Sequence, residues 1–360
     1  MTNNRITVTR PHVPDRSRIF KYLNQALDSR WLTNEGPLVR ELTSRLKEYL
    51  GVKHLLLVAN GTMGLLVVLK LLNCRKVFTT PFSFPATSSA PAWLGMQVAY
   101  GDICPDSYNL LPPENVDPDG AGCILPTHVF GNPCDLDRMS RVSEDWNAPL
   151  VYDAAHAFGV KVAGNSVLES GDMSVLSFHA TKLFHCVEGG AVAFSSEEQL
   201  AEAREMINFG FDAEGGIRRV GINAKMNEFE AAMGLAVLEE IDDVMARYRE
   251  NYELYDELLN PDLQRQVIKP EVEYNYSYFP VCFEDNATLQ RVIDSLKAAD
   301  VFPRRYFAPS LDEVDLFGAE DSCIVSRDLA SRILCLPMFA DLAEASVRSI
   351  AKIVNENLVI

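Results

Sequence analysis

Three short segments place reactive residue types beside runs of apolar residues. The first is Asn-Gly-Thr at 60–62, the second contains Asp153 and His156, and the third ends at Lys182. A glycine turn at a helix start presents N–H groups to an anion, and a buried carboxylate needs a nearby cation. A desolvated lysine amine becomes nucleophilic. The combination predicts a site that binds a phosphate, stabilises a cation and offers an amine.

Gly61 and Thr62 separate an apolar run from a helical pattern. Here the free backbone N–H groups and the Thr62 hydroxyl would be donors for a phosphate. On its own, the pair is better explained as a tight turn and a helix cap. The segment is neither a G-x-G-x-x-G nor a Walker motif, so it does not support nicotinamide or ATP binding.

Asp153 ends the apolar run Leu-Val-Tyr at 150–152, where an unpaired carboxylate would be costly. A protonated pyridine nitrogen is a suitable partner, because protonation lets pyridoxal 5′-phosphate (PLP) withdraw electrons. His156 follows three residues later, within reach of the 3′-oxygen of the same ring. Without this context, His156 would be interpreted as a satisfied core histidine.

Lys182 ends the segment Ser-Phe-His-Ala-Thr-Lys at 177–182, just before a Gly-Gly pair that opens another apolar run. From such a loop the amine reaches into a cleft and can form a Schiff base, and Ser177 is placed to bind the phosphate. Most lysines are simply solvated. However, Lys182 follows Asp153 by 29 residues, and the order of phosphate turn, aspartate, serine and lysine is that of fold-type I PLP enzymes.

The elements that must position these residues alternate between strands and helices, which predicts an α/β fold with a mostly parallel sheet. We predict helices at 63–72, 197–208 and 227–258, and another ending near Gly95. The strands are predicted at 55–59, 77–80, 98–100, 122–125, 150–152, 173–178 and 191–194. The polar residues follow strand ends, at the edge where open parallel sheets bind ligands.

The last hundred or so residues mix strand patterns at 278–283 and 332–336 with helical patterns at 289–299 and 343–354. We therefore predict two domains. The first is a large PLP-binding domain with an N-terminal arm at 1–245, and the second is a small α+β domain at 246–360.

The composition excludes several classes of function. The eight cysteines form no C-x-x-C pair or zinc-ligand spacing, so neither a metal site nor a disulfide framework is expected. A net charge of −17 without a long basic run argues against nucleic acid. The pairs Arg218-Arg219 and Arg304-Arg305 still offer local cations to an anionic substrate. Neither a signal peptide nor a membrane span is visible, which predicts a soluble cytoplasmic protein without a membrane partner.

Over nearly its whole length the chain resembles the DegT/StrS family of sugar aminotransferases, which are fold-type I, aspartate aminotransferase-like PLP enzymes. The segments that carry the resemblance are Trp31-Leu-Thr-Asn-Glu-Gly-Pro, Ala59-Asn-Gly-Thr, Pro81-Phe-Ser-Phe-Pro-Ala-Thr-Ser-Ser-Ala, His128-Val-Phe-Gly-Asn-Pro, Asp153-Ala-Ala-His, Ser177-Phe-His-Ala-Thr-Lys-Leu-Phe-His-Cys-Val-Glu-Gly-Gly, Gly221-Ile-Asn-Ala-Lys-Met-Asn-Glu-Phe-Glu-Ala-Ala, Arg305-Tyr-Phe-Ala-Pro and Leu334-Cys-Leu-Pro-Met.

The resemblance implies roles for individual residues. Lys182 would carry PLP and move the proton between donor carbon and cofactor carbon, Asp153 would pair with the pyridine nitrogen, and His156 would contact the 3′-oxygen. Asn223 would reach the phosphate of the neighbouring subunit's cofactor, which implies a homodimer with two shared sites. Phe84, which would otherwise be a core aromatic, would stack on the ring. The phosphate would be held by Gly61, Thr62 and Ser177. The substrate would be contacted by Thr33, Arg218 and Tyr306.

The Ser-Phe-His-x-x-Lys and Glu-Gly-Gly patterns resemble the 4-aminotransferases of the family. We expect an amino group to pass from L-glutamate to dTDP-4-keto-6-deoxyglucose, giving dTDP-4-amino-4,6-dideoxyglucose. A UDP-linked substrate and a 3-keto sugar remain open, since His156 replaces a frequent Gln and Leu183 a frequent Asn. A PLP-dependent sugar dehydratase would carry His in place of Lys182, and a silent scaffold protein would have lost the cofactor residues.

Overall fold

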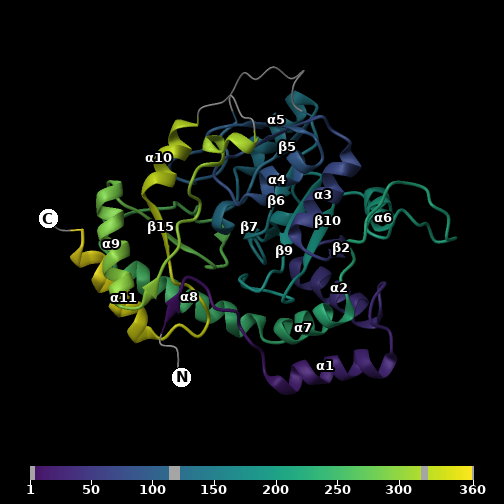
Figure 1. Cartoon of the computed structure of the whole chain (residues 1–360), viewed down its shortest axis with the longest axis horizontal. Helices are drawn as coiled ribbons and strands as arrows, with labels where there is room; N and C mark the ends of the chain where they lie inside the picture. The colour runs from purple at the N-terminus through teal and green to yellow at the C-terminus, as the bar shows by residue number, and fades with distance from the viewer. Residues whose placement is uncertain (1–4, 113–121, 318–322, 359–360) are drawn as a thin grey trace.

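The computed structural model describes residues 5–112, 122–317 and 323–358. Two sheets lie at its centre (Figure 1), one with the strand order β2-β10-β9-β6 and the other β4-β3-β5. Parallel bridges from Ile124 to Leu150 and from Thr127 to Asp153 join β5 to β6, so the two sheets continue one another. Only β10 runs antiparallel to its neighbours among these described strands, which confirms the mostly parallel sheet.

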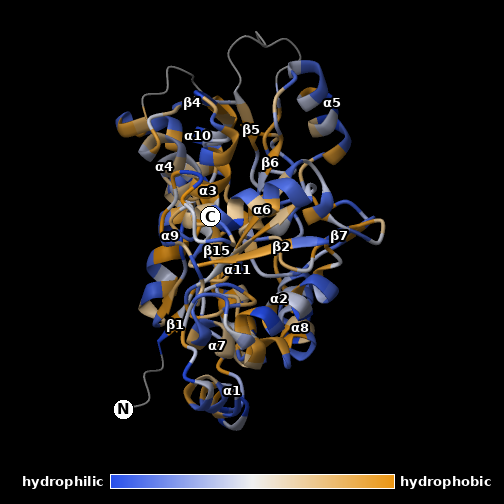
Figure 2. Ribbon diagram, turned by 90° about the vertical axis from the view of Figure 1, so that its right-hand side faces the viewer, coloured by the Kyte–Doolittle hydropathy of each residue, from blue (hydrophilic) through white to orange (hydrophobic). Residues whose placement is uncertain are grey.

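The strands of this central sheet lie within two residues of their predicted bounds. They are β2 (His54–Val58), β3 (Lys76–Thr79), β4 (Gln97–Tyr100), β5 (Cys123–Leu125), β6 (Val151–Asp153), β9 (Met173–Ser177) and β10 (Gly190–Phe194). Every residue of β5, β6 and β10 is buried, because helices cover both faces of the sheet. Figure 2 shows the hydrophobic colour concentrated in strands such as β2 and β5.

The two faces of β2 pack against different helices, as the alternation of side chains in a strand requires. Leu56 and Val58 pack in one cluster with the apolar side of α3 (Gly61–Leu72) and α6 (Glu197–Met206). Leu55 and Leu57 pack in another with α2 (Pro37–Leu50), α7 (Glu228–Leu238) and α8 (Ile241–Leu258). The helices α1 (Arg16–Ser29), α4 (Ala86–Trp93) and α5 (Leu136–Trp146) complete this part of the chain.

The helical stretch predicted at 227–258 is divided in two at Glu239 and Glu240. The backbone of Glu240 leaves the helical region at φ −117° and ψ 5°. Its carboxylate accepts a hydrogen bond from the Asp15 N–H group at 3.0 Å, and the Glu239 carboxylate accepts one from the Tyr22 hydroxyl at 2.5 Å. The break is thus held against the N-terminal segment, a contact that helical periodicity alone does not reveal.

The C-terminal part contains the antiparallel strands β11 (Gln264–Arg265), β13 (Phe279–Cys282) and β15 (Ile333–Leu336). The helices α9 (Asn286–Ala298), α10 (Ile324–Arg332) and α11 (Glu344–Glu356) lie beside them at the left of Figure 1. In addition, β1 (Ile6–Thr7) pairs with β14 (Val301–Phe302), so the N-terminal segment reaches this part. The predicted domain boundary at 245/246 falls within α8, and the division into two domains stays a prediction.

Shorter elements connect these parts. The strands β7 (Lys161–Val162), β8 (Asn165–Ser166) and β12 (Val272–Glu273) form a small sheet. Short 3-10 helices occupy Val129–Gly131, Val167–Glu169, Leu311–Glu313 and Asp315–Phe317. Within the described residues, no helix combines the length and the hydrophobicity that crossing a bilayer requires.

Candidate active site

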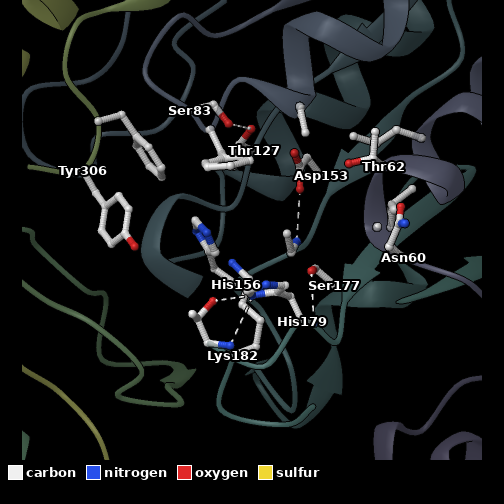
Figure 3. A pocket seen from close by; sticks show the side chains of 18 of the residues that line it. Asn60, Thr62, Ser83, Thr127, Asp153, His156, Ser177, His179, Lys182 and Tyr306 are labelled. Atoms are coloured by element: carbon white, nitrogen blue, oxygen red, sulfur yellow. Dashed lines mark hydrogen bonds between the residues drawn. The ribbon is translucent and has the colours of Figure 1, made fainter. Parts of the chain in front are cut away.

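A pocket of about 520 Å³ lies where β6 and β9 end and α3 begins. Figure 3 shows Asn60, Thr62 and Ser177 on one side of it and Tyr306 on the other, with Lys182 and His156 between them. The predicted residues that line this pocket are Gly61, Thr62, Phe84, Asp153, His156, Ser177, Lys182 and Tyr306. We call the side with Gly61, Thr62, Asp153, Ser177 and Lys182 the cofactor end, and the side with Arg304 and Tyr306 the substrate end. Phe84, predicted to stack on the cofactor ring, also lines the pocket, and this role stays a prediction.

The start of α3 forms an anion-binding turn. The Asn60 side chain accepts a hydrogen bond from the Met63 N–H group at 2.9 Å, while the N–H groups of Gly61 and Thr62, in the first turn, have no acceptor within the helix. A Cβ atom on Gly61 would lie 3.1 Å from the Cβ of Ser177, so glycine permits this close approach. The serine and threonine hydroxyls add donors. The arrangement fits a phosphate.

Asp153 is buried at the end of β6, where its carboxylate is held by neutral donors. The Thr87 hydroxyl donates to Oδ2 at 2.7 Å and the Ala155 N–H group donates to Oδ1 at 3.1 Å. Burial raises the pKa of Asp153, while these two hydrogen bonds and the charge of Lys182 oppose the rise. A protonated ring nitrogen in the pocket would supply the cation that this carboxylate needs to stay ionised.

Thr87 belongs to a chain of buried hydroxyls that the sequence analysis did not identify as part of the site. Ser83 lies 2.7 Å from the Thr87 hydroxyl and 3.0 Å from that of Thr127, oxygen to oxygen. These bonds fix the donor that faces Asp153. The sequence signal for this chain is the segment Pro81-Phe-Ser-Phe-Pro-Ala-Thr, which carries two of the hydroxyls and forms part of the family resemblance.

Lys182 extends into the pocket from the loop between β9 and β10. Burial lowers the pKa of Lys182 to about 8, although the nearby charge of Asp153 opposes this change. A larger fraction of the amine is therefore neutral near pH 7 than for a solvated lysine, as a nucleophile requires. The Nζ atom donates a hydrogen bond to the Tyr278 hydroxyl at 3.2 Å, a partner that the sequence did not reveal.

His156 presents a neutral ring to the pocket. Its Nδ1 atom accepts a hydrogen bond from the Phe130 N–H group at 3.2 Å, which assigns the ring proton to Nε2. Burial, helped by the charge of Lys182, lowers the pKa of His156 well below its usual value. Its Nε2–H group is a suitable donor for a ring oxygen, so the geometry is compatible with the predicted contact to the 3′-oxygen of PLP.

The substrate end combines an aromatic ring with one guanidinium group. The Arg304 guanidinium lies over the Tyr306 ring, 5.1 Å from its centroid, and both side chains line the pocket. The neighbouring Arg305 instead donates to the backbone carbonyls of residues 330 and 331. Of the Arg304-Arg305 pair, Arg304 is therefore the one that faces a ligand.

Three predicted residues do not line this pocket: Thr33, Arg218 and Asn223. All three are exposed. Arg218 pairs with Asp212 at 2.5 Å, and Asn223 is bridged to Asn208 at the base of the segment between α6 and α7. This segment projects from the molecule at the right of Figure 1. The roles of these three residues stay predictions.

Comparisons with known proteins identify the family to which the chain belongs. The model of the DegT/DnrJ/EryC1/StrS aminotransferase family matches residues 14–355. The chain is 36% identical over 363 residues to a dTDP-4-amino-4,6-dideoxy-D-glucose transaminase from Shigella dysenteriae, covering 98% of each chain. It is 32% identical over 368 residues to a protein of the same name from Escherichia coli, covering 98% of this chain and 99% of the other.

A solved structure supports the same relationship. The crystal structure of DesI in the presence of its TDP-sugar product matches with a TM-score of 0.90 and 34% identity, covering 99% of this chain and 93% of that one. The chain therefore belongs to the DegT/DnrJ/EryC1/StrS aminotransferase family and is a PLP-dependent sugar aminotransferase. The family resemblance, the fold-type I class and the PLP cofactor predicted from the sequence are confirmed.

Proposed function

We propose that the protein transfers an amino group from L-glutamate to dTDP-4-keto-6-deoxyglucose, giving dTDP-4-amino-4,6-dideoxyglucose. Support comes from the full-length similarity to two transaminases named for this product and from the structural match to DesI, which was solved with a TDP-sugar product. A UDP-linked keto sugar is the alternative, and the experiment below distinguishes the two.

The single observation that carries the proposed amino transfer is the set of residues at the cofactor end. PLP withdraws electrons from the carbon next to the amino group that is being transferred. Gly61, Thr62 and Ser177 would bind its phosphate. Asp153 would keep the ring nitrogen protonated, because a buried carboxylate favours a neighbouring cation. Lys182 would bind the cofactor covalently between turnovers and, once released, would take a proton at Nζ from the donor carbon and pass it to the cofactor carbon.

At the substrate end, we propose that Arg304 binds an anionic group and that Tyr306 packs against the sugar. Nucleotide sugars carry a diphosphate and glutamate carries carboxylates, and guanidinium groups bind both kinds of oxyanion. Within the described residues, no carboxylate forms an ion pair with Arg304, so it is free for a ligand. Thr33 and Arg218 are the other substrate contacts that we propose.

We further propose a homodimer in which Asn223 reaches the partner's cofactor phosphate. The projecting segment that carries Asn223 exposes Ile217 at 72% and Val220 at 76%. Trp31 and Leu32, beside Thr33, are also exposed. Apolar side chains gathered on projecting segments favour contact with another protein surface, and such contact would bring Asn223, Arg218 and Thr33 to a shared site.

The proposed reaction is tested with purified protein, PLP and two keto sugars that differ only in the nucleotide. L-Glutamate should remove the visible absorbance of the bound cofactor, and dTDP-4-keto-6-deoxyglucose should restore it and yield an aminated sugar detected by mass spectrometry. Restoration by the UDP-linked sugar alone would contradict the dTDP assignment. Loss of the sugar hydroxyl without gain of nitrogen would contradict amino transfer and favour a dehydratase.

A further inference from the structure

Tyr278 contributes a hydroxyl to the pocket for which neither the sequence analysis nor the proposed reaction gives a role. It accepts the hydrogen bond from Lys182 Nζ at 3.2 Å, across 96 residues of sequence. Its ring lies against the His156 ring, with centroids 4.7 Å apart. Tyr278 immediately precedes β13, whereas Lys182 lies between β9 and β10. The contact therefore joins the C-terminal part to the catalytic lysine.

The position of Tyr278 is fixed by Asn275, three residues earlier. The buried Asn275 amide donates to the carbonyl groups of His156 at 2.8 Å and Phe158 at 3.0 Å. Its Oδ1 atom accepts a hydrogen bond from the Ser277 hydroxyl at 2.9 Å. Both carbonyl groups belong to the segment directly after β6, and β6 itself ends in Asp153, the carboxylate of the cofactor end. The Tyr278 hydroxyl is thus held at a constant place relative to the cofactor site.

The chemistry of this hydroxyl matches both forms of a lysine amine. Burial raises the pKa of Tyr278 well above its usual value, so the phenol keeps its proton. A neutral hydroxyl accepts a hydrogen bond from a charged amine and donates one to a neutral amine. Within the described part of the chain, Lys182 Nζ is the only hydrogen-bond partner of the Tyr278 hydroxyl. A proton-carrying lysine alternates between these two forms.

We propose that Tyr278 is a positioning residue for Lys182, whose amine it holds in the pocket while that amine is free of the cofactor and carries the proton. The inference rests on the proposed role of Lys182 as proton carrier and adds a residue from the C-terminal part to the reaction. It also gives that part a direct function in the transfer step, in addition to its contacts with the substrate.

The substitution Tyr278→Phe tests this proposal in the holoenzyme. In a single turnover, the rate at which L-glutamate removes the visible absorbance should fall about tenfold, because the variant loses one hydrogen bond to a charged group. The glutamate concentration that gives half the maximal rate should stay unchanged. Tyr274→Phe is the matched control. The Tyr274 hydroxyl is also buried in this segment, but donates to the Phe130 carbonyl at 2.7 Å, and its loss should change neither quantity.

A second measurement uses the full chain without cofactor and does not depend on turnover. A hydrogen bond to the charged amine is stronger than one to the neutral amine. The Tyr278 hydroxyl therefore favours the charged form, and its removal should lower the pKa of Lys182 further. Labelling of Lys182 by acetic anhydride, followed by mass spectrometry over a pH series, should have its midpoint about half a unit to one unit lower in Tyr278→Phe. Asp153 raises the Lys182 pKa, and this contribution is the same in both proteins.

An unchanged rate and an unchanged labelling midpoint in Tyr278→Phe would overturn the proposal. A change confined to the affinity for the keto sugar would also overturn it, since Tyr278 would then be a substrate contact. Failure of the proposed function gives a different result in the unsubstituted protein. That protein would show no response to glutamate if the donor were wrong, and no restoration by the dTDP-linked sugar if the acceptor were wrong.

Discussion

The two ends of the pocket differ in the burial of their residues and in the elements that carry them. At the cofactor end, Asp153 is buried at the end of β6, and Lys182 is half-buried in the loop that follows β9. At the substrate end, Arg304 is exposed and lies on a connecting segment. Chemistry requires groups that are fixed before the reaction starts, whereas recognition of different sugars is altered most easily through loops.

The largest expected effect is at the cofactor end. Lys182→Ala removes the amine that binds PLP and carries the proton, so turnover should fall by about four to six powers of ten, as for other covalent catalysts. Steady-state rates with both substrates measure this loss. PLP should still bind through the phosphate turn, and normal turnover by this variant would contradict the assignment of Lys182.

Asp153→Asn should have the next largest effect. The variant keeps the size of the side chain but cannot hold a proton on the ring nitrogen, and the rate should fall by about two to four powers of ten. The half-reaction with L-glutamate isolates this step. Thr87→Val provides a comparison, because it removes one hydrogen bond to the carboxylate and leaves its charge. A near-native rate in Asp153→Asn would show that the carboxylate is only structural.

Asn223 tests whether the site is shared between subunits. Asn223→Asp would put a carboxylate against the cofactor phosphate and should lower activity about a hundredfold. Mixing this variant with Lys182→Ala under conditions that exchange subunits should restore about a quarter of normal activity, because hybrid dimers contain one intact site. If no activity returns although hybrids form, Asn223 does not act across the interface.

At the substrate end, a smaller effect with a different signature is expected. Arg304→Gln should raise the KM of one substrate about tenfold, because one charge-assisted hydrogen bond is lost. The value of kcat should change little. The affected substrate, glutamate or the nucleotide sugar, identifies the anion that Arg304 binds. Arg305→Gln is the control, because Arg305 contacts backbone carbonyls. Equal KM effects from both substitutions would mean that the contact is not specific.

An effect of similar size, obtained without any substitution, is expected in the pH dependence of cofactor binding. Because burial lowers the pKa of Lys182 to about 8, the neutral amine becomes more abundant as the pH rises through this value. The rate at which PLP forms its visible band with cofactor-free protein should increase about tenfold between about pH 7 and about pH 9. A rate that keeps rising steeply above this range would show that Lys182 has an ordinary pKa.

The features that the sequence predicts and those that it does not predict differ in how far apart the interacting residues lie in the chain. The strand bounds and the cofactor end were predicted because each depends on local patterns, such as an apolar run that ends in Asp153. Thr87 and Tyr278 were missed because they approach Asp153 and Lys182 from 66 and 96 residues away in the sequence, and no local pattern encodes such a distance. The break at Glu239 and Glu240 was missed for a related reason, since their partners lie in the N-terminal segment.

The claim on which the whole account depends is that Lys182 carries PLP. Treating the purified holoenzyme with sodium borohydride fixes the cofactor on the amine that holds it, and digestion with mass spectrometry then locates the added mass. We predict a single modified peptide that contains Lys182, and no such peptide after the protein has been converted by L-glutamate. Modification of another lysine, or of none, would contradict the account.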